Sequence, residues 1–126
     1  MKSDHKLSNE QLDILDNNAT EPEFSGTLLY NEEHGMYCCV RCGNELFSSQ
    51  HKFDSGCGWP SFYDVADTKA VRLAEDRSHC MQRVEVRCAK CDGHLGHVFK
   101  DAPEQPTGVR FCINSSILDF VNKDIS

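Results

Sequence analysis

The sequence lacks a long apolar run and an excess of positive charge. The polar residues 1–6 lead into no hydrophobic stretch, so we expect neither a secretory signal peptide nor a membrane span. Lys and Arg number 13 against 20 Asp and Glu, which gives a formal net charge of −7. An acidic surface repels phosphates, so we expect no nucleic-acid partner. The cytoplasm is the expected location.

The 126 residues also contain no low-complexity tract, no linker and no internal repeat apart from a duplicated cysteine pair. A chain of this length can bury a core of its own, so we expect a single domain over 1–126, in which 1–23 form a helix and a lead-in. No apolar stripe in the sequence needs a second chain to cover it, and we expect a monomer.

A short helix is expected near the N-terminus. Ser8 fits the N-cap position and Gln11 completes a capping box, and the helix should end near residues 17–18. Its apolar stripe, Leu12 and Leu15, is narrow. We therefore expect the helix on the surface of the domain and assign it no catalytic role.

The pattern of the rest of the chain is typical of short strands separated by turn residues. We expect strands over 27–30, 36–39, 46–47, 70–73, 81–88 and 109–115. Alternation within 82–88 puts Val84, Val86 and Cys88 on one face and the charged residues on the other. The fold class is therefore mainly β, with antiparallel sheets. The stretch 115–121 fits either a short helix or an irregular apolar segment.

Eight cysteines are more than the stability of such a chain requires. In a reducing compartment cysteines more often bind metals or act in catalysis than form disulfides. A secreted domain with four disulfides is the alternative. The spacing of the cysteines distinguishes the two interpretations.

Two Cys-x-x-Cys pairs, Cys39 with Cys42 and Cys88 with Cys91, are each followed closely by a glycine. This spacing predicts one structural zinc ion held by four thiolates, which leaves no open position for catalysis. The pairs are far apart in the sequence, so the ion would join two separate turns of a larger sheet. A redox motif and two disulfides are the alternatives.

Cys112 lies in the stretch 108–115, which reads as a strand. Alternation puts Arg110, Cys112 and Asn114 on the face opposite to the apolar side chains. A cation close to a thiol favours the thiolate, which is the nucleophilic form. The alternative is a buried structural cysteine, because free cysteines are often buried.

Two further stretches match neither a core pattern nor an ordinary loop. In 53–62, glycines on both sides of Cys57 free its backbone to move toward a partner, and Trp59 follows two residues later. In 93–99, His94 and His97 stand three residues apart. Without further evidence, Trp59 fits a core aromatic and the histidines fit structural residues with satisfied hydrogen bonds.

Together these motifs resemble the B-type methionine sulfoxide reductases, which reduce the R epimer. The resemblance rests on Gly-Cys-Gly-Trp-Pro-Ser-Phe at 56–62, His-Leu-Gly-His-Val-Phe at 94–99 and Arg-Phe-Cys-Ile-Asn-Ser at 110–115, with the two Cys-x-x-Cys pairs. It covers 24–121, which would form the catalytic core. The implied activity is repair of oxidised methionine, free or protein-bound, without an organic cofactor.

The resemblance implies a mechanism based on two thiols. Cys112 would attack the sulfoxide sulfur and be left as a sulfenic acid. Cys57 would condense with it to a disulfide that a thioredoxin-type reductant reduces. Cys80, which departs from the family's pattern, could be a second resolving thiol.

The resemblance also implies roles around the substrate. His97, helped by His94 and Asn114, would hold and protonate the sulfoxide oxygen, while Arg110 favours the thiolate. Trp59 would contact the methyl group, and His79 would border the pocket. The main alternative is a non-catalytic, zinc-clipped module that binds peptides through Trp59, and such a module needs neither Cys57 nor Cys112.

Overall fold

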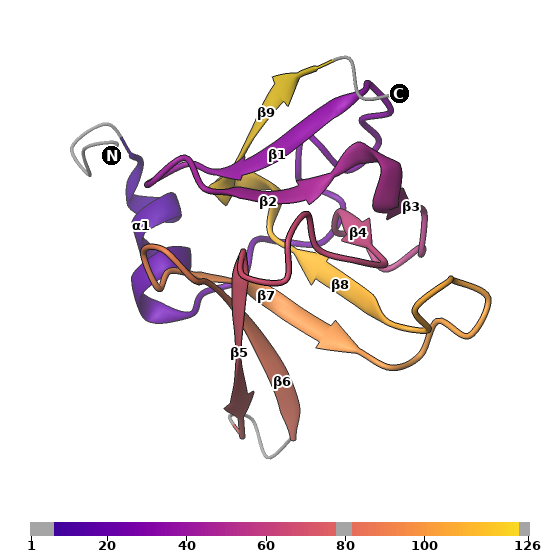
Figure 1. The fold of residues 1–126 in the computed structure, drawn as a ribbon. Coiled ribbons are helices and arrows are strands. Elements are labelled where there is room, and N and C mark those ends of the chain that lie inside the picture. The colour runs from indigo at the N-terminus through magenta and orange to yellow at the C-terminus, as the bar shows by residue number, and fades with distance from the viewer. Residues whose placement is uncertain (1–6, 78–81, 124–126) are drawn as a thin grey trace.

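The computed structural model describes residues 7–77 and 82–123 (Figure 1). In chain order its elements are α1 (Asn9–Asn17), β1 (Gly35–Cys39), β2 (Glu45–Ser48), the 3-10 helix η2 (Ser49–His51), β3 (Lys52–Phe53), β4 (Ser61–Phe62), β5 (Val71–Asp76), β6 (Arg83–Cys88), β7 (His94–Phe99), β8 (Arg110–Ile113), the 3-10 helix η4 (Ser115–Ile117) and β9 (Leu118–Asn122). The prediction of a mainly β fold with one short N-terminal helix is confirmed. In the described ranges no helix is both long and apolar enough to cross a membrane.

The strands form two antiparallel sheets. The smaller sheet has the order β2-β1-β9, and the larger has the order β3-β4-β8-β7-β6-β5. In Figure 1 the small sheet lies above β7 and β8, with α1 to one side. Strand β8 is an inner strand of the large sheet, paired with β4 and β7, so its side chains are held from both sides.

Aromatic side chains from both sheets meet in the core. Phe47 of β2 stacks on Phe62 of β4 with ring centroids 4.5 Å apart, and Tyr37 of β1 meets the same ring edge-on at 5.1 Å. All three side chains are fully buried. Buried aromatic pairs add to the free energy of burial, and here they fix the short strand β4.

The predicted helix start is confirmed. The Ser8 Oγ accepts the N–H of Gln11 at 3.1 Å, and the Gln11 Oε1 accepts the N–H of Ser8 at 2.8 Å. The helix ends at Asn17 as expected. Its buried side chains are Ile14 and Leu15, so the apolar face differs from the predicted stripe, and the helix packs into the core rather than only lying on the surface.

Five expected strands correspond to β1, β2, β5, β6 and β8 within a few residues at their ends. The strand predicted over 27–30 is wrong, because this segment folds into turns in which the Leu29 N–H donates to the Gly26 carbonyl. The stretch 115–121 is neither of the two expected forms but η4 followed by β9. Strands β3, β4, β7 and β9 were not predicted, since they are very short or lack alternation.

The predicted faces of β6 are correct only in part. Val86 and Cys88 are buried as expected, but Val84 is 40% exposed and Glu85 only 5% exposed. The hairpin of β5 and β6, to which Val84 belongs, extends away from the rest of the fold (Figure 1). Of the charged side chains of β6, Glu85 contacts His94 of β7 and Arg83 contacts Asp76 of β5, as described below.

The glycine at position 96 allows β7 and β8 to pair closely. A Cβ at Gly96 would lie 2.0 Å from the carbonyl oxygen of Cys112. That oxygen belongs to the backbone and cannot turn aside as a flexible side chain could. The pairing brings His97 directly opposite Cys112.

We therefore expect Gly96→Ala to destabilise the protein by about 3 kcal/mol or more, because overpacking against backbone must break the pairing of β7 with β8. Gly108→Ala is the control: Gly108 has φ +75° and open space around it, so the cost is strain alone, about 1–2 kcal/mol. Denaturant unfolding measures both. A smaller loss for Gly96→Ala than for Gly108→Ala would contradict the steric argument.

Candidate active site and metal centre

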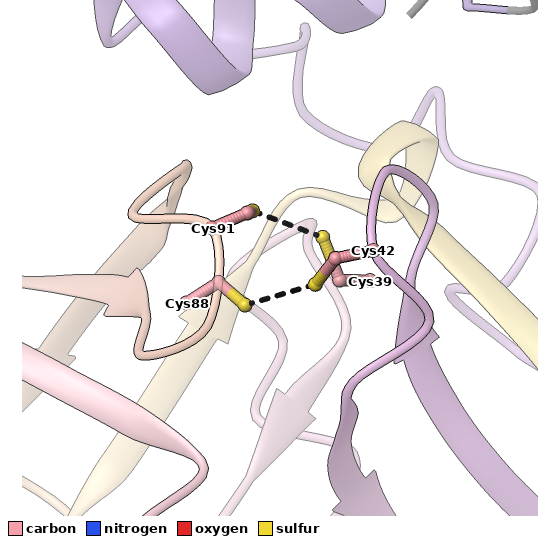
Figure 2. A group of neighbouring side chains, drawn as sticks. All are labelled: Cys39, Cys42, Cys88 and Cys91. Atoms are coloured by element: carbon pink, nitrogen blue, oxygen red, sulfur yellow. Dashed lines mark hydrogen bonds between the residues drawn. The ribbon is translucent and has the colours of Figure 1, made fainter. Parts of the chain in front are cut away.

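The four cysteines of the two Cys-x-x-Cys pairs form one cluster (Figure 2). All four sulfurs lie within 4.8 Å of one another. The Sγ atoms of Cys39 and Cys91 are 3.7 Å apart, and those of Cys42 and Cys88 are 3.5 Å apart. As expected from the sequence, the cluster joins the turn after β1 to the turn between β6 and β7.

Each of the two turns uses one residue with positive φ. In the first turn this is Gly43, with φ +78°, whose N–H donates to the Cys39 carbonyl. In the second turn it is Asp92, with φ +64°, and not Gly93. Gly93 instead allows α1 to pack closely against this turn, because a Cβ at position 93 would lie 2.6 Å from a methyl carbon of Leu15.

The chemistry of the cluster fits a zinc ion. Sulfurs at tetrahedral corners about 2.3 Å from zinc lie about 3.8 Å from one another, close to the observed spacings, whereas a disulfide bond is about 2.05 Å long. Burial raises the pKa of the Cys42 thiol to about 11. Four ionised thiols this close together repel one another, so the cluster fits a cation that all four sulfurs would hold, with no ligand position left for substrate.

Two cysteines outside this cluster face one another. The Sγ of Cys57, in the loop between β3 and β4, lies 2.9 Å from the Sγ of Cys112 on β8. Ser61 is the register partner of Cys112, and its Oγ lies 3.4 Å from the Cys57 sulfur. The pairing of β4 with β8 therefore brings two thiols together from positions 55 residues apart.

Arg110 holds its guanidinium against this thiol pair. Its Nη1 donates to the Cys112 Sγ at 2.5 Å. Asp101 fixes the guanidinium with two hydrogen bonds, of 3.0 Å from Nε and 2.8 Å from Nη2. The same group lies 4.6 Å from the centre of the Phe99 ring, a cation–π contact. The cation is thereby aimed at the sulfur.

The two thiols ionise as a pair. The hydrogen bond with Cys112 lowers the pKa of Cys57 to about 4, and the same bond raises the pKa of Cys112. Arg110 opposes the second effect, since its charge stabilises a thiolate on Cys112. The pair therefore carries one negative charge, with the thiolate on Cys57 and the proton on Cys112. A proton transfer across the 2.9 Å contact would move that charge to Cys112, beside Arg110.

A pocket of about 250 Å³ opens onto these sulfurs. Of the residues predicted for the site, it brings together Cys57, Trp59, His97, Arg110, Cys112 and Asn114. Its wall is completed by Gly96 and Phe99 of the motif at 94–99, which had no role assigned, and by Thr20 and Arg83, which lie outside the motifs. A small pocket with apolar walls and a few converging polar groups is the usual form of a ligand site.

His97 reaches the pocket from β7. Its Nε2–H donates to the Oδ2 of Asp76 at 2.7 Å, and Arg83 lies 3.3 Å from the same oxygen. The two partners are opposite one another in the pairing of β5 with β6. The sequence did not identify them as site residues, although the charged alternation of β6 was the signal that placed Arg83 on a polar face.

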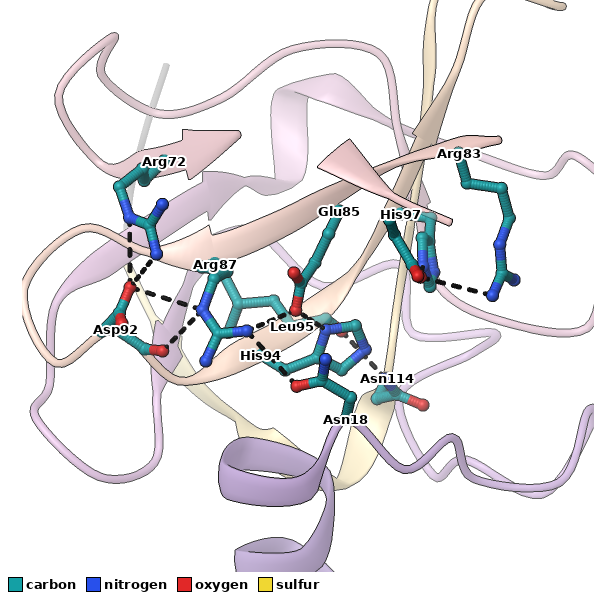
Figure 3. A network of polar contacts seen from close by, with 11 residues as sticks. Asn18, Arg72, Arg83, Glu85, Arg87, Asp92, His94, Leu95, His97 and Asn114 are labelled. Atoms are coloured by element: carbon teal, nitrogen blue, oxygen red, sulfur yellow. Dashed lines mark hydrogen bonds and ion pairs between the residues drawn. The ribbon is translucent and has the colours of Figure 1, made fainter. Parts of the chain in front are cut away.

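His94 lies behind the pocket wall rather than in it. The ring is 1% exposed, and its Nδ1 is 2.6 Å from the Oε2 of Glu85, which Arg87 also contacts (Figure 3). Burial lowers the pKa of His94, and Glu85 opposes this. The ring centroids of His94 and His97 are 5.4 Å apart, so His94 packs against the residue that lines the pocket.

Both ends of the Asn114 amide have partners. Its Nδ2 donates to the carbonyl of Leu95 at 2.9 Å (Figure 3), and its Oδ1 accepts the N–H of Glu21 at 2.9 Å. The amide is thus fixed in the wall beside Cys112. His79 and Cys80 lie outside the described residues.

The fold and the site define a class of protein. Two thiols are in contact at the base of a pocket and carry one negative charge beside a guanidinium. This arrangement is typical of a thiol-dependent oxidoreductase. The separate four-cysteine cluster fits a metal ion that stabilises the fold.

Comparison with known proteins identifies the family. A family model described as SelR domain matches residues 7–122. The chain is 56% identical over 118 residues to the peptide methionine sulfoxide reductase MsrB of Methanosarcina mazei, covering 94% of this chain and 84% of that relative. It is 53% identical over 116 residues to the MsrB of Escherichia coli (strain K12 / DH10B), covering 92% and 84%. The chain therefore belongs to the MsrB family, and it is an oxidoreductase.

Removal of the metal should loosen the fold. Since a closed four-thiolate site contributes folding free energy, we expect a strong chelator to lower the melting temperature by more than about 10 °C or to abolish cooperative melting. Metal analysis before and after treatment is the control for removal. Metal-free protein that melts unchanged would contradict the structural role of the cluster.

Proposed function

We propose that this protein reduces methionine R-sulfoxide, free or within a protein, to methionine by means of Cys112 and Cys57. The observation that carries the proposal is the 2.9 Å contact between the two sulfurs at the base of the pocket. The printed names of the relatives, peptide methionine sulfoxide reductase, supply the substrate class.

In the first step the Cys112 thiolate attacks the sulfoxide sulfur. The sulfoxide oxygen takes a proton and is transferred to the Cys112 sulfur, which becomes a sulfenic acid, and methionine is released. The substrate sulfur gains two electrons, and the Cys112 sulfur loses two. The shared charge of the pair provides the thiolate, and Arg110 stabilises it on the attacking sulfur.

His97 is the proposed acid for the sulfoxide oxygen, because it stands opposite Cys112 in the strand pairing and lines the pocket. Trp59 offers a flat apolar wall to the methyl group. His94 and Asn114 support these groups from behind, as their buried partners suggest. Holding the methyl group, the oxygen and the direction of attack together would select one epimer. The role of His79 stays a prediction.

In the second step the Cys57 thiol attacks the sulfenic sulfur, water leaves, and a disulfide forms between Cys57 and Cys112. The sulfurs are already in contact, so only a small movement is needed. A dithiol reductant of the thioredoxin type then reduces the disulfide.

One zinc ion per chain would serve the fold alone. The protein would work as a monomer in a reducing compartment such as the cytoplasm, where the disulfide between Cys57 and Cys112 can be reduced again.

Replacement of Cys57 separates the two steps. Cys57→Ser should release one equivalent of methionine from methionine R-sulfoxide and then stop, because Cys112 is left as a sulfenic acid without its resolving thiol. Single-turnover release and thioredoxin-driven turnover are measured in parallel. Cys112→Ser is the control and should release none.

Cys80 is the competing resolving thiol. It would appear as thioredoxin-driven turnover that persists in Cys57→Ser and is lost when Cys80 is also replaced. If Cys57→Ser releases no first equivalent, Cys57 takes part in the first step and the proposed division of roles is wrong.

A further inference from the structure

Glu21 is a buried acid that belongs to none of the motifs. Its side chain is 4% exposed, and carboxylates are rarely buried unless their oxygens are paired. Oε2 accepts the backbone N–H of Ser115, and Oε1 accepts that of Ser116, both at 2.9 Å. The carboxylate therefore caps the start of η4, which the N-cap residue Asn114 does not do with its own side chain.

The backbone of Glu21 contacts two residues of the pocket wall. Its N–H donates to the Oδ1 of Asn114 at 2.9 Å, and its carbonyl accepts the Nε1–H of Trp59 at 3.0 Å. Asn114 and Trp59 both line the pocket that opens onto Cys112. One residue thus joins two parts of the wall that come from different segments of the chain.

The segment after Glu21 also lies against the loop that carries Cys57. The Phe24 N–H donates to the carbonyl of Gly58 at 2.7 Å, and Phe24 has φ +62°, which is unfavourable for a bulky residue. A Cβ at Gly58 would lie 2.7 Å from the Cβ of Glu23. Such a strained backbone persists only where neighbouring contacts hold it, and two charge-assisted hydrogen bonds of the buried Glu21 carboxylate hold the start of this segment.

We propose that Glu21 is a positioning residue of the substrate pocket: its carboxylate anchors the segment 21–24 on η4, and its backbone then sets Trp59 and Asn114 relative to Cys112. The inference rests on the proposed reduction of methionine R-sulfoxide. It extends the functional unit into the lead-in, upstream of the core that begins at residue 24. A displaced Trp59 weakens binding of the substrate before and during the reaction, so the effect falls on KM.

The test is Glu21→Gln, which keeps the size of the side chain but replaces one carboxylate oxygen with an amide NH₂ group. That group faces one of the two backbone N–H donors and cannot accept its hydrogen bond. We expect KM for free methionine R-sulfoxide to rise about tenfold or more, because small displacements in a site cost much binding. A merely structural role would reduce the folded fraction and lower kcat at constant KM. Trp59 is the only tryptophan, so its emission should shift to longer wavelength in Glu21→Gln.

Glu23→Gln is the matched control, since it removes the same charge from an exposed neighbour in the same segment. It should leave KM and emission unchanged. Equal KM and equal emission for the two variants would overturn the positioning role. If the unmodified protein does not reduce the sulfoxide, the proposed function fails, and the emission comparison still decides whether Glu21 positions Trp59.

Trp59→Phe provides a second test if Glu21→Gln folds poorly. It keeps an apolar ring but lacks the N–H that binds the Glu21 carbonyl, so KM should rise with Glu21 intact. Where both variants fold, the double variant should be no worse than the more severe single variant. Unchanged KM in Trp59→Phe, or fully additive effects, would contradict the proposed link.

Discussion

The contact between the sulfurs of Cys57 and Cys112 is the constraint on which the rest of the structure depends. A loop and an inner strand must be held so that two atoms stay 2.9 Å apart and still open onto a pocket. The strand pair β4–β8 does this, although β4 has only two residues. Its stability comes from the Phe62 side chain, which is buried between the sheets against Phe47. Core packing and thiol chemistry are therefore linked through one short strand.

The cysteines divide by environment. Four are gathered in a closed cluster in which a cation would use every sulfur, so none is available for reaction. Cys57 and Cys112 are only half-buried, and Arg110 supplies a fixed cation that leaves the sulfur open to the pocket. The cluster still contributes to the site at a distance, because it fixes the turn that begins β7, and β7 carries His97.

Much of this could be predicted from the sequence, and the failures have physical causes. The spacing of the Cys-x-x-Cys pairs predicted the four-cysteine cluster, and the family motifs identified six pocket residues. Glu21, Asp76 and Asp101 were missed because a single acid has no local pattern; its partners are distant in the sequence. The faces of β6 were assigned by polarity, yet Glu85 is buried by pairing with His94 and Arg87, which alternation cannot indicate.

The central claim is that Cys57 and Cys112 act as one acid whose charge is already formed at neutral pH. The most direct measurement is the rate of alkylation of the pair by iodoacetamide from about pH 5 to pH 9, a window that includes the pKa of an ordinary thiol at about 8.5. With the pKa of Cys57 lowered to about 4 by the bond with Cys112, the thiolate is lost only below the window, so the rate should be nearly constant. In Cys112→Ala the bond is absent, the pKa of Cys57 rises, and the rate should increase with pH. A rate in the unmodified protein that rises steadily through the window, as for an ordinary thiol, would contradict the account.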